Sequence, residues 1–297
     1  MASKGEKISK SKGNSKVEPR ELVKTHSADS IRYWAGTGRL GNDIIFSEET
    51  LARGQKLINK LWNVAKFIEM HIHDYNENKE KFEEEVKEYN DLEYIDKWIL
   101  AKYEEMEKGY LKYLEEYEVG LALNHLEKFF WNFCDDYIEI VKHRLYRPEE
   151  FGERARYSGQ KTVYTLLFKL IQAFSIYLPY VTEEIYHEIY MNDMNIPSIH
   201  ITSIENLKIK DKNKETYLNI GNTIMEIISE LRGEKTNNNV SLKTPFSIVE
   251  IDVNSNILEG ITKAEKDFKA TVTIENLKLN DKQTSLENNF NILKSEL

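Results

Sequence analysis

The chain has 297 residues, with 40% hydrophobic and 31% charged side chains and a net charge of -9. This balance, with only 5 prolines and 13 glycines, is typical of a globular protein rich in helices and excludes low-complexity and collagen-like chains. The lone cysteine, Cys134, excludes an internal disulfide framework, and no run approaches the ~20 apolar residues of a membrane-spanning helix.

The charge is unevenly distributed along the chain. Residues 1–24 hold seven basic and three acidic side chains, and residues 142–161 hold six and three. Residues 69–118 have the opposite balance, with seventeen acidic side chains and seven lysines. Charges are screened beyond ~8–10 Å at cellular salt, so the local balance decides what a surface attracts. The overall acidity therefore does not exclude a surface that binds RNA.

The first feature in chain order is KISKSKGN at residues 7–14, a cationic stretch rich in hydroxyl groups. By itself it is equally compatible with a disordered basic tail. Pro19 ends the connector that follows. HSADSIRYWAGTG then predicts a short helix over 28–35 that stops at Gly36, and GRLGNDIIFSEET reads as a loop.

Five amphipathic helices are predicted from there to residue 190. In the first, Ser47 is the expected N-cap, with acidic residues in the first turn, and the helix runs to about Met70. The second, DLEYIDKWILAKYEEMEKGYLKYLEEY, is expected to be capped by Asn90 or Asp91. The third begins near Glu118. Its apolar residues recur at spacings of three and four, at Val119, Leu123, Leu126, Phe130, Phe133, Tyr137 and Val141.

The fourth helix is expected over roughly 158–177, where Pro179 breaks the pattern. Thr182 is expected to cap the fifth, which runs through Tyr190. Amphipathic helices joined by short loops predict a helical bundle.

The composition changes after Pro197, where Asn, Thr and Ile become frequent. Residues 246–253 and 270–279 alternate as strands, with helices expected at about 215–233 and 255–268. We therefore predict a mainly α protein, a helical bundle followed by a small α/β subdomain. The predicted domains are a loop and connector over 1–46, the bundle over 47–195 and the subdomain over 196–297.

One flank of the helix that begins after Ser47 has residue types that suit recognition of RNA. The apolar stripe of this helix, at Leu57, Leu61, Val64 and Ile68, is expected to face the core. A neighbouring flank holds Lys56, Lys60, Asn63 and Phe67. An aromatic ring can stack under an unstacked base while lysine meets a phosphate, so this flank suits an RNA loop. The alternative is that Phe67 borders the core and the lysines solvate the helix.

Other chemically suggestive residues are expected to be structural. His71 and His73 lie two apart and point in different directions, so we expect no metal site there. Asp135 and Asp136 are adjacent on a helix and diverge, which argues against an acid/base pair.

Three aromatic residues of the third helix, Phe130, Trp131 and Phe133, are expected in the bundle core. The basic segment 142–161 either touches an RNA backbone or is a solvated loop.

Six blocks occur in an order and spacing that resemble a known family. They are KISKSKGN, ADSIRYWAG, GNDIIFSEE, GQKLINKLWNVAKF, FFWNFCDDYIEIVKHRLY and LPYVTEEIY. Together they resemble the C-terminal half of class I aminoacyl-tRNA synthetases, most closely the valyl type. The resemblance is dense over 7–190 and thinner over 200–297. The alternatives are an isoleucyl- or leucyl-type synthetase and a stand-alone RNA-binding helical module without catalysis.

The resemblance implies that residues 7–11 are the KMSKS signature loop, which closes over ATP. Lys7 and Lys10 would be the catalytic residues, because their ammonium groups stabilise the charge that gathers on the α-phosphate and pyrophosphate. The implied ATP-binding residues are Lys7, Ser9, Lys10 and Ser11. Ile8 stands where the family usually has methionine, an apolar replacement of similar volume.

The same resemblance implies the partners of the complete enzyme. They are ATP, with Mg²⁺ bound through the nucleotide, valine and tRNA-Val, and Lys60 and Phe67 would face the anticodon. No HIGH-type motif precedes the loop in this sequence, so the chain alone is expected neither to activate valine nor to hold a cofactor tightly. We expect a cytoplasmic monomer that binds no membrane and no metal of its own.

Overall fold

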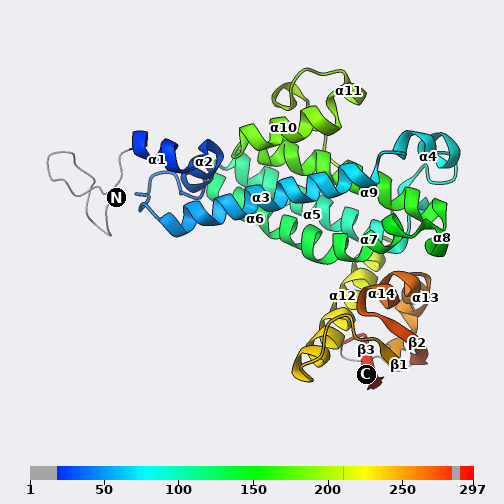
Figure 1. Ribbon diagram of the computed structural model, residues 1–297. Helices are drawn as coiled ribbons and strands as arrows, with labels where there is room; N and C mark the ends of the chain where they lie inside the picture. Colours follow the sequence, from blue (N-terminus) through cyan, green and yellow to red (C-terminus); the bar gives the residue numbers. More distant parts are fainter. Residues whose placement is uncertain (1–18, 210, 283–287) are drawn as a thin grey trace. The chain divides into compact units, whose positions relative to one another are not determined.

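The computed structural model describes residues 19–209, 211–282 and 288–297 (Figure 1). Residues in mutual contact form two units, each assembled from three separate segments of the chain. Unit 1 contains the described residues up to Met70 with Glu105–Phe130 and Tyr164–Leu207, and unit 2 contains His71–Glu104, Trp131–Val163 and Lys208–Leu297. The predicted domain boundaries at residues 46 and 195 stay predictions.

The chain is mainly helical, with one small sheet near its C-terminal end, which confirms the predicted fold class (Figure 1). The helices in chain order are α1 (Pro19–Thr25), α2 (Ala28–Gly36), α3 (Glu48–His71), α4 (Tyr75–Phe82), α5 (Tyr94–Glu115), α6 (Val119–Asn132), α7 (Ile138–Tyr146), α8 (Pro148–Phe151), α9 (Glu153–Phe174), α10 (Pro179–Ile189), α11 (Met191–Met194), α12 (Lys214–Asn237), α13 (Ser255–Lys263) and α14 (Glu265–Val272). The strands are β1 (Phe246–Asn254), β2 (Ile274–Lys282) and β3 (Phe290–Glu296). Among the described residues, none of these helices has both the length and the apolar character needed to cross a membrane.

Helix α3 forms as its sequence predicts. The Ser47 hydroxyl accepts a hydrogen bond from the Thr50 N–H at 3.1 Å, which confirms Ser47 as the N-cap. The predicted core stripe is buried, with Leu57, Leu61, Val64 and Ile68 all 6% exposed or less. The 3.6-residue period of α3 therefore separates one buried stripe from the rest of its surface.

The cap predicted for the second long helix is wrong. Helix α5 begins at Tyr94, after a 3₁₀ turn at Tyr89–Asp91. The Asp91 carboxylate accepts a hydrogen bond from the Glu88 N–H at 2.8 Å, and Leu92 then takes an extended conformation. Glu88 is the N-cap of this turn and Asp91 is its third residue, so neither Asn90 nor Asp91 caps α5.

The third predicted helix contains a π-helical turn that the sequence did not reveal. It lies at Phe133–Tyr137, between α6 and α7. Phe130 and Phe133 are fully buried, as predicted. Trp131 is only half-buried, so its assignment to the core is wrong. The predicted fourth helix begins earlier than expected, because α9 starts at Glu153.

Thr182 does not cap the fifth helix. Helix α10 already starts at Pro179, whose missing N–H costs nothing in a first turn. The Thr182 hydroxyl donates to the Leu178 carbonyl at 2.8 Å, inside unit 1. The buried Asp29 carboxylate of α2 accepts instead from the N–H groups of Tyr180 and Val181, at 3.2 and 2.8 Å. A residue distant in sequence therefore satisfies the start of α10.

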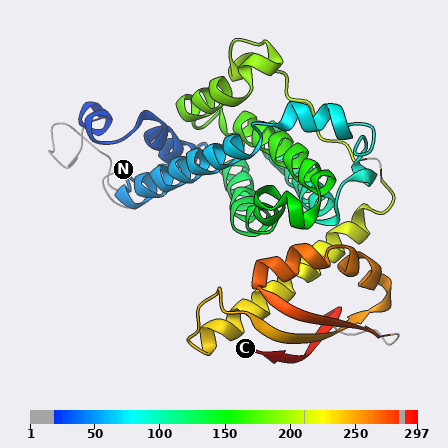
Figure 2. The ribbon, with the colours of Figure 1, turned by 45° about the vertical axis from the view of Figure 1, so that its right-hand side comes forward.

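The C-terminal part of unit 2 is a three-stranded sheet in the order β2-β1-β3. Strand β1 pairs parallel with β2 and antiparallel with β3. Val249, Ile251 and Val253 are buried, and α13 and α14, orange in Figure 2, lie on one side of the strands. The helix predicted over 255–268 is two helices broken at Ala264, β2 starts only at Ile274, and β3 was not predicted.

Candidate nucleic-acid interface

Helix α3 places the predicted RNA-contacting residues on one flank, beside the buried stripe. Lys56 and Asn63 are exposed, while Lys60 and Phe67 are half-buried. Met70 lies one turn beyond Phe67 and is 62% exposed, so an apolar side chain extends the flank. Its spacing of three from Phe67 was the signal that could have found it. We call Lys56, Lys60, Asn63 and Phe67 the α3 flank.

The lysines of α3 differ in how their charge is used. Lys66 pairs with Glu188 and Glu69, and its ammonium lies 4.9 Å from the centre of the Trp62 ring. The hydrogen bond that the Lys66 ammonium donates to Glu188, followed by the one that it donates to Glu69, raises the pKa of Lys66. Lys56, in contrast, is exposed and has no ion pair within the part of the chain that the structure describes. Its charge is therefore available to a ligand.

A buried hydrogen-bonded network fixes α3 against α2 and α6 inside unit 1. The Tyr33 hydroxyl donates to Glu127 at 2.8 Å, and the Arg53 Nε donates to the other oxygen of the same carboxylate at 3.0 Å. Tyr33 and Glu127 are buried. Burial, followed by the hydrogen bond with Glu127, raises the pKa of Tyr33. Burial acts to lower the pKa of Arg53, but Glu127 outweighs it and the pKa is raised.

Gly54 brings the backbone of α3 close to this network. A Cβ at this position would lie 2.7 Å from Cδ1 of the Tyr33 ring. A glycine here therefore permits a close approach between α3 and α2, and the position of the α3 flank depends on that approach.

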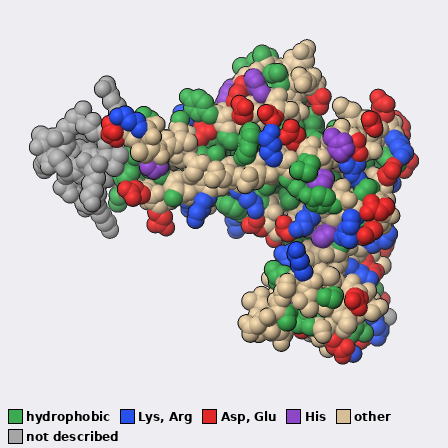
Figure 3. Space-filling view, in the orientation of Figure 1, with side chains coloured by type: hydrophobic (Ala, Val, Ile, Leu, Met, Phe, Trp, Pro, Cys, Tyr) green, Lys and Arg blue, Asp and Glu red, His purple; other side chains and the backbone are tan. Residues whose placement is uncertain are grey.

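The basic segment 142–161 is helical, in α7, α8 and α9, so the solvated-loop interpretation is wrong. All six of its cations are paired with carboxylates of unit 2. The pairs are Lys142 with Glu139, Arg144 with Asp96 and Asp267, Arg147 with Glu150, Arg154 with Glu93, Arg156 with Asp74, and Lys161 with Glu83. Figure 3 shows acidic and basic side chains interspersed over α4 and α8. Four of the six cations therefore pair with carboxylates of the acidic segment 69–118.

The suggestive polar residues of the π-helical turn and of α7 differ in their surroundings. Asp136 accepts a hydrogen bond from the Asn132 side chain at 3.1 Å, and burial raises its pKa. Asp135 is exposed. Burial, followed by the nearby charge of Arg147, lowers the pKa of His143 to about 4. The described residues contain no group of three or more His, Cys, Asp or Glu side chains that could hold a metal ion.

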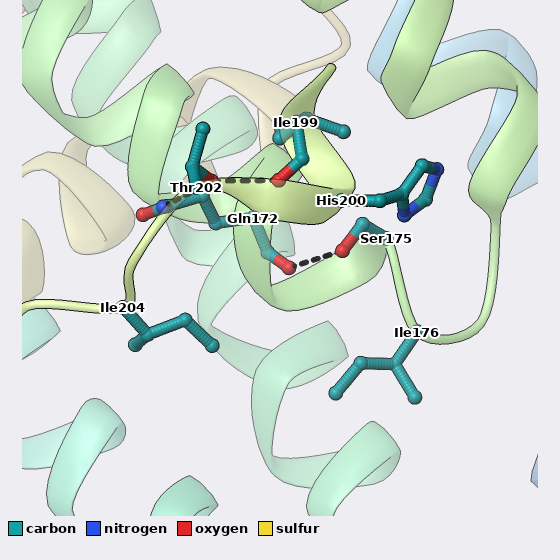
Figure 4. Close-up of a pocket in the computed structure, with 7 residues that line it drawn as sticks. All are labelled: Gln172, Ser175, Ile176, Ile199, His200, Thr202 and Ile204. Carbon is teal, nitrogen blue, oxygen red and sulfur yellow. Dashed lines mark hydrogen bonds between the residues drawn. The ribbon is translucent and has the colours of Figure 1, made fainter. Parts of the chain in front are cut away.

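A small pocket of about 220 Å³ lies elsewhere in unit 1, between the end of α9 and the turn at Ile199–Ile201 (Figure 4). Its wall contains Gln172, Ser175, Ile176, Ile199, His200, Thr202 and Ile204. The hydroxyls of Ser175 and Thr202 donate to the backbone carbonyls of Gln172 and Ile199, at 2.7 and 2.6 Å. None of the predicted site residues lines this pocket. The hydroxyl groups of Ser175 and Thr202 already donate their protons to the backbone, so they have none to donate to a ligand.

The fold agrees with a comparison to known families. Residues 96–251, more than half of the chain, match the family described as the anticodon-binding domain of tRNA ligase. The chain belongs to this family. The matched range begins in α5 and ends in β1, so it spans most of the helical bundle and reaches the sheet, while α3 precedes it.

Individual proteins that are similar to this chain over most of its length belong to one narrower class of tRNA ligase. The chain is 34% identical to the valine–tRNA ligase of Ehrlichia ruminantium (strain Gardel) over 292 residues, covering 96% of this chain and 33% of that protein. It is 35% identical to the valine–tRNA ligase of Rickettsia conorii over 84% of this chain and 30% of that protein. For the enzyme of Wolbachia pipientis wMel the identity is 33%, over 100% of this chain and 32% of that protein. The chain thus spans about a third of the length of these curated relatives.

Proposed function

We propose that the chain is part of a valine–tRNA ligase and that the α3 flank contacts the anticodon loop of tRNA-Val. The single observation that carries the proposal is the flank itself, where exposed Lys56 and Asn63 lie beside half-buried Lys60 and Phe67. The similarity to valine–tRNA ligases is the reason for proposing tRNA-Val as the RNA that is bound.

The chemistry of the flank suits a single-stranded RNA loop. The half-buried ring of Phe67 is held by the helix and can stack against one unstacked base. Lys56 and Lys60 can meet neighbouring phosphates, and the Asn63 amide can both donate and accept at a base edge. Stacking tolerates any base, so discrimination between bases would come from the polar side chains.

We also propose the roles that the resemblance gives to the signature loop. Lys7 and Lys10 would stabilise the charge on pyrophosphate, and Ser9 and Ser11 would help to bind ATP, which carries Mg²⁺ through its phosphates. All four residues lie outside the described residues, so their roles rest on the motif alone. Valine as substrate, a monomeric state and a cytoplasmic location complete the proposal and rest on the same resemblance.

The test is binding of the purified chain to transcribed tRNA-Val and to a tRNA-Val with a changed anticodon, by fluorescence anisotropy at two salt concentrations. Lys60→Ala and Phe67→Ala are measured beside two controls in unit 1. Lys112→Ala removes an exposed helical lysine, and Tyr180→Ala removes an aromatic side chain that is 68% exposed. We expect Phe67→Ala to weaken binding of the cognate tRNA by ~1–3 kcal/mol, because one base loses its stacking partner.

Two further results would complete this pattern. Lys60→Ala should weaken binding and reduce its salt dependence, because one phosphate contact is lost. Both controls should bind like the unaltered chain. Equally weak binding to both RNAs that disappears with salt, and that Phe67→Ala leaves unchanged, would refute recognition by the α3 flank.

A further inference from the structure

Arg53 lies on α3 next to the α3 flank but belongs to none of the sites described so far. It precedes Lys56 by three residues and Lys60 by seven, so successive turns of the helix bring these side chains to neighbouring positions. Its side chain is 59% exposed, although its partner Glu127 is almost completely buried. One edge of the guanidinium therefore faces the protein interior and the rest faces solvent.

The inward edge of this guanidinium is held in two places. Nε donates to one oxygen of Glu127 at 3.0 Å, and Nη2 lies 2.9 Å from the other oxygen. The Tyr33 hydroxyl, which also binds Glu127, fixes the carboxylate in turn. A guanidinium has five N–H donors, and this geometry uses two of them on the carboxylate. The remaining donors lie on a plane that cannot turn freely.

We propose that Arg53 extends the RNA-binding face of α3 and donates hydrogen bonds to a phosphate of the bound RNA, with Glu127 and Tyr33 as positioning residues. This inference rests on the proposed function. It adds a contact of a different kind from the lysines, because the pair of Arg53 and Glu127 has no net charge. Lys56 and Lys60 supply attraction, and Arg53 supplies donors whose direction is set before binding.

The arrangement also explains why an arginine occupies this position. A buried carboxylate needs a cation, and lysine could supply one. A lysine ammonium would act as a point charge on Glu127, whereas the fork of Arg53 can bind the carboxylate and a phosphate at the same time. The exposed part of the side chain is available for the second role.

The decisive variant is the double substitution Arg53→Gln with Glu127→Gln. It leaves the net charge of the chain unchanged and leaves no buried ion unpaired, and Tyr33 keeps an acceptor. The matched control is Arg39→Gln with Glu118→Gln. That pair is joined at 2.7 Å, and its arginine is 65% exposed but does not belong to α3. Both double variants are compared with the unaltered chain for binding to the two RNAs over a range of salt concentrations, after circular dichroism has shown that they fold.

We expect the Arg53 and Glu127 variant to bind both RNAs about three- to tenfold more weakly, with little change in salt dependence, because the pair that it replaces has no net charge. The control pair should change neither quantity. If the double variant fails to fold, Arg53→Lys keeps the charge and removes the fork, and about threefold weaker binding is expected. A folded variant of either kind that binds both RNAs with unchanged affinity would overturn the inference.

The outcome for Arg53 can be separated from that for the anticodon. If the unaltered chain fails to distinguish the two RNAs while the double variant still weakens both, the anticodon assignment fails and the phosphate contact stands. If the unaltered chain distinguishes them and the double variant behaves normally, only the role of Arg53 fails.

Discussion

Arg144 lies in unit 2 among more carboxylates than one guanidinium can neutralise. Its two Nη atoms each lie 2.8 Å from an oxygen of Asp96, and its Nε lies 3.0 Å from Asp267. Asp96 also accepts hydrogen bonds from the hydroxyls of Tyr137 and Ser158, at 2.7 and 2.5 Å. Asp96 therefore accepts four hydrogen bonds, and Asp267 is the carboxylate with less support.

The environment of Asp267 shifts its titration. Burial raises its pKa to about 6, the charge of Arg144 acts in the opposite direction, and the nearby carboxylates of Asp96 and Glu93 raise the pKa further. An Asp in the unfolded chain titrates near 3.8. Between these two values the folded state binds more protons than the unfolded state, so the contribution of Asp267 to stability falls as the pH rises.

We predict that Asp267→Asn changes this pH dependence. The Asn side chain does not titrate, so the variant gains stability relative to the unaltered chain as the pH rises from about 4 to 7. The relative gain should be up to about 3 kcal/mol, the equivalent of a shift of two pKa units. Urea unfolding at pH 4.5, 6.0 and 7.5, followed by circular dichroism, measures it. A stability difference that is the same at all three pH values would contradict the prediction.

The surroundings of a helical glycine decide whether alanine can replace it without a clash. In α3, a Cβ on Gly54 would meet the Tyr33 ring, which Glu127 holds in place. In α12, a Cβ on Gly233 would meet nothing within 4 Å. Both positions have the same helical backbone, so the pair separates packing from helix propensity.

We expect opposite effects of Gly→Ala at the two positions. Gly233→Ala should stabilise the chain by ~0.5–1 kcal/mol, the gain from restricting the unfolded backbone. Gly54→Ala should destabilise it by about 1–3 kcal/mol despite the same gain, because the ring cannot move without breaking its hydrogen bond. Urea midpoints at pH 7.5 compare the two variants. Stabilisation by Gly54→Ala would show that α2 and α3 can separate at little cost.

Elements with a strong period were predictable from the sequence, and those defined by distant partners were not. The apolar repeat of α3 is enough to predict both its buried core stripe and the position of the α3 flank beside it. The start of α10 was missed, because Asp29, which satisfies its N–H groups, lies far back in the chain. The pairing of Arg53 with Glu127 was missed for the same reason, since Glu127 lies three helices further along the chain, in α6.

At the scale of the whole molecule, the order of helical bundle and small α/β subdomain was predictable from the sequence. The assignment of a chemical reaction rests on resemblance. Segments of both charge signs were visible in the sequence. The pairing of Asp96 with Arg144 and of Asp74 with Arg156 was not, because it requires parts of the chain that are far apart in sequence to meet in space. Strand β3 was also missed, because its pattern becomes a strand only through pairing with β1.

We predict that the 297-residue chain alone does not activate valine. Lys7 and Lys10 would act on the phosphates, but these 297 residues contain no HIGH-type motif, which the resemblance implies as the other half of the ATP site. Valine-dependent exchange of radioactive pyrophosphate into ATP should stay at the level of a reaction without protein. Exchange above that level which Lys10→Ala abolishes would show that the chain carries a complete site.

The assembly of unit 2 from three segments determines the order in which a ribosome can complete it. Asp96 and Arg144 are synthesised well before α14, which supplies Asp267. Until then the Arg144 Nε lacks its carboxylate, and the surface of α7 that α14 will cover is open to water and to chaperones. Synthesis that pauses before residue 267 therefore leaves this unit with an unfinished interior, however well its earlier helices have formed.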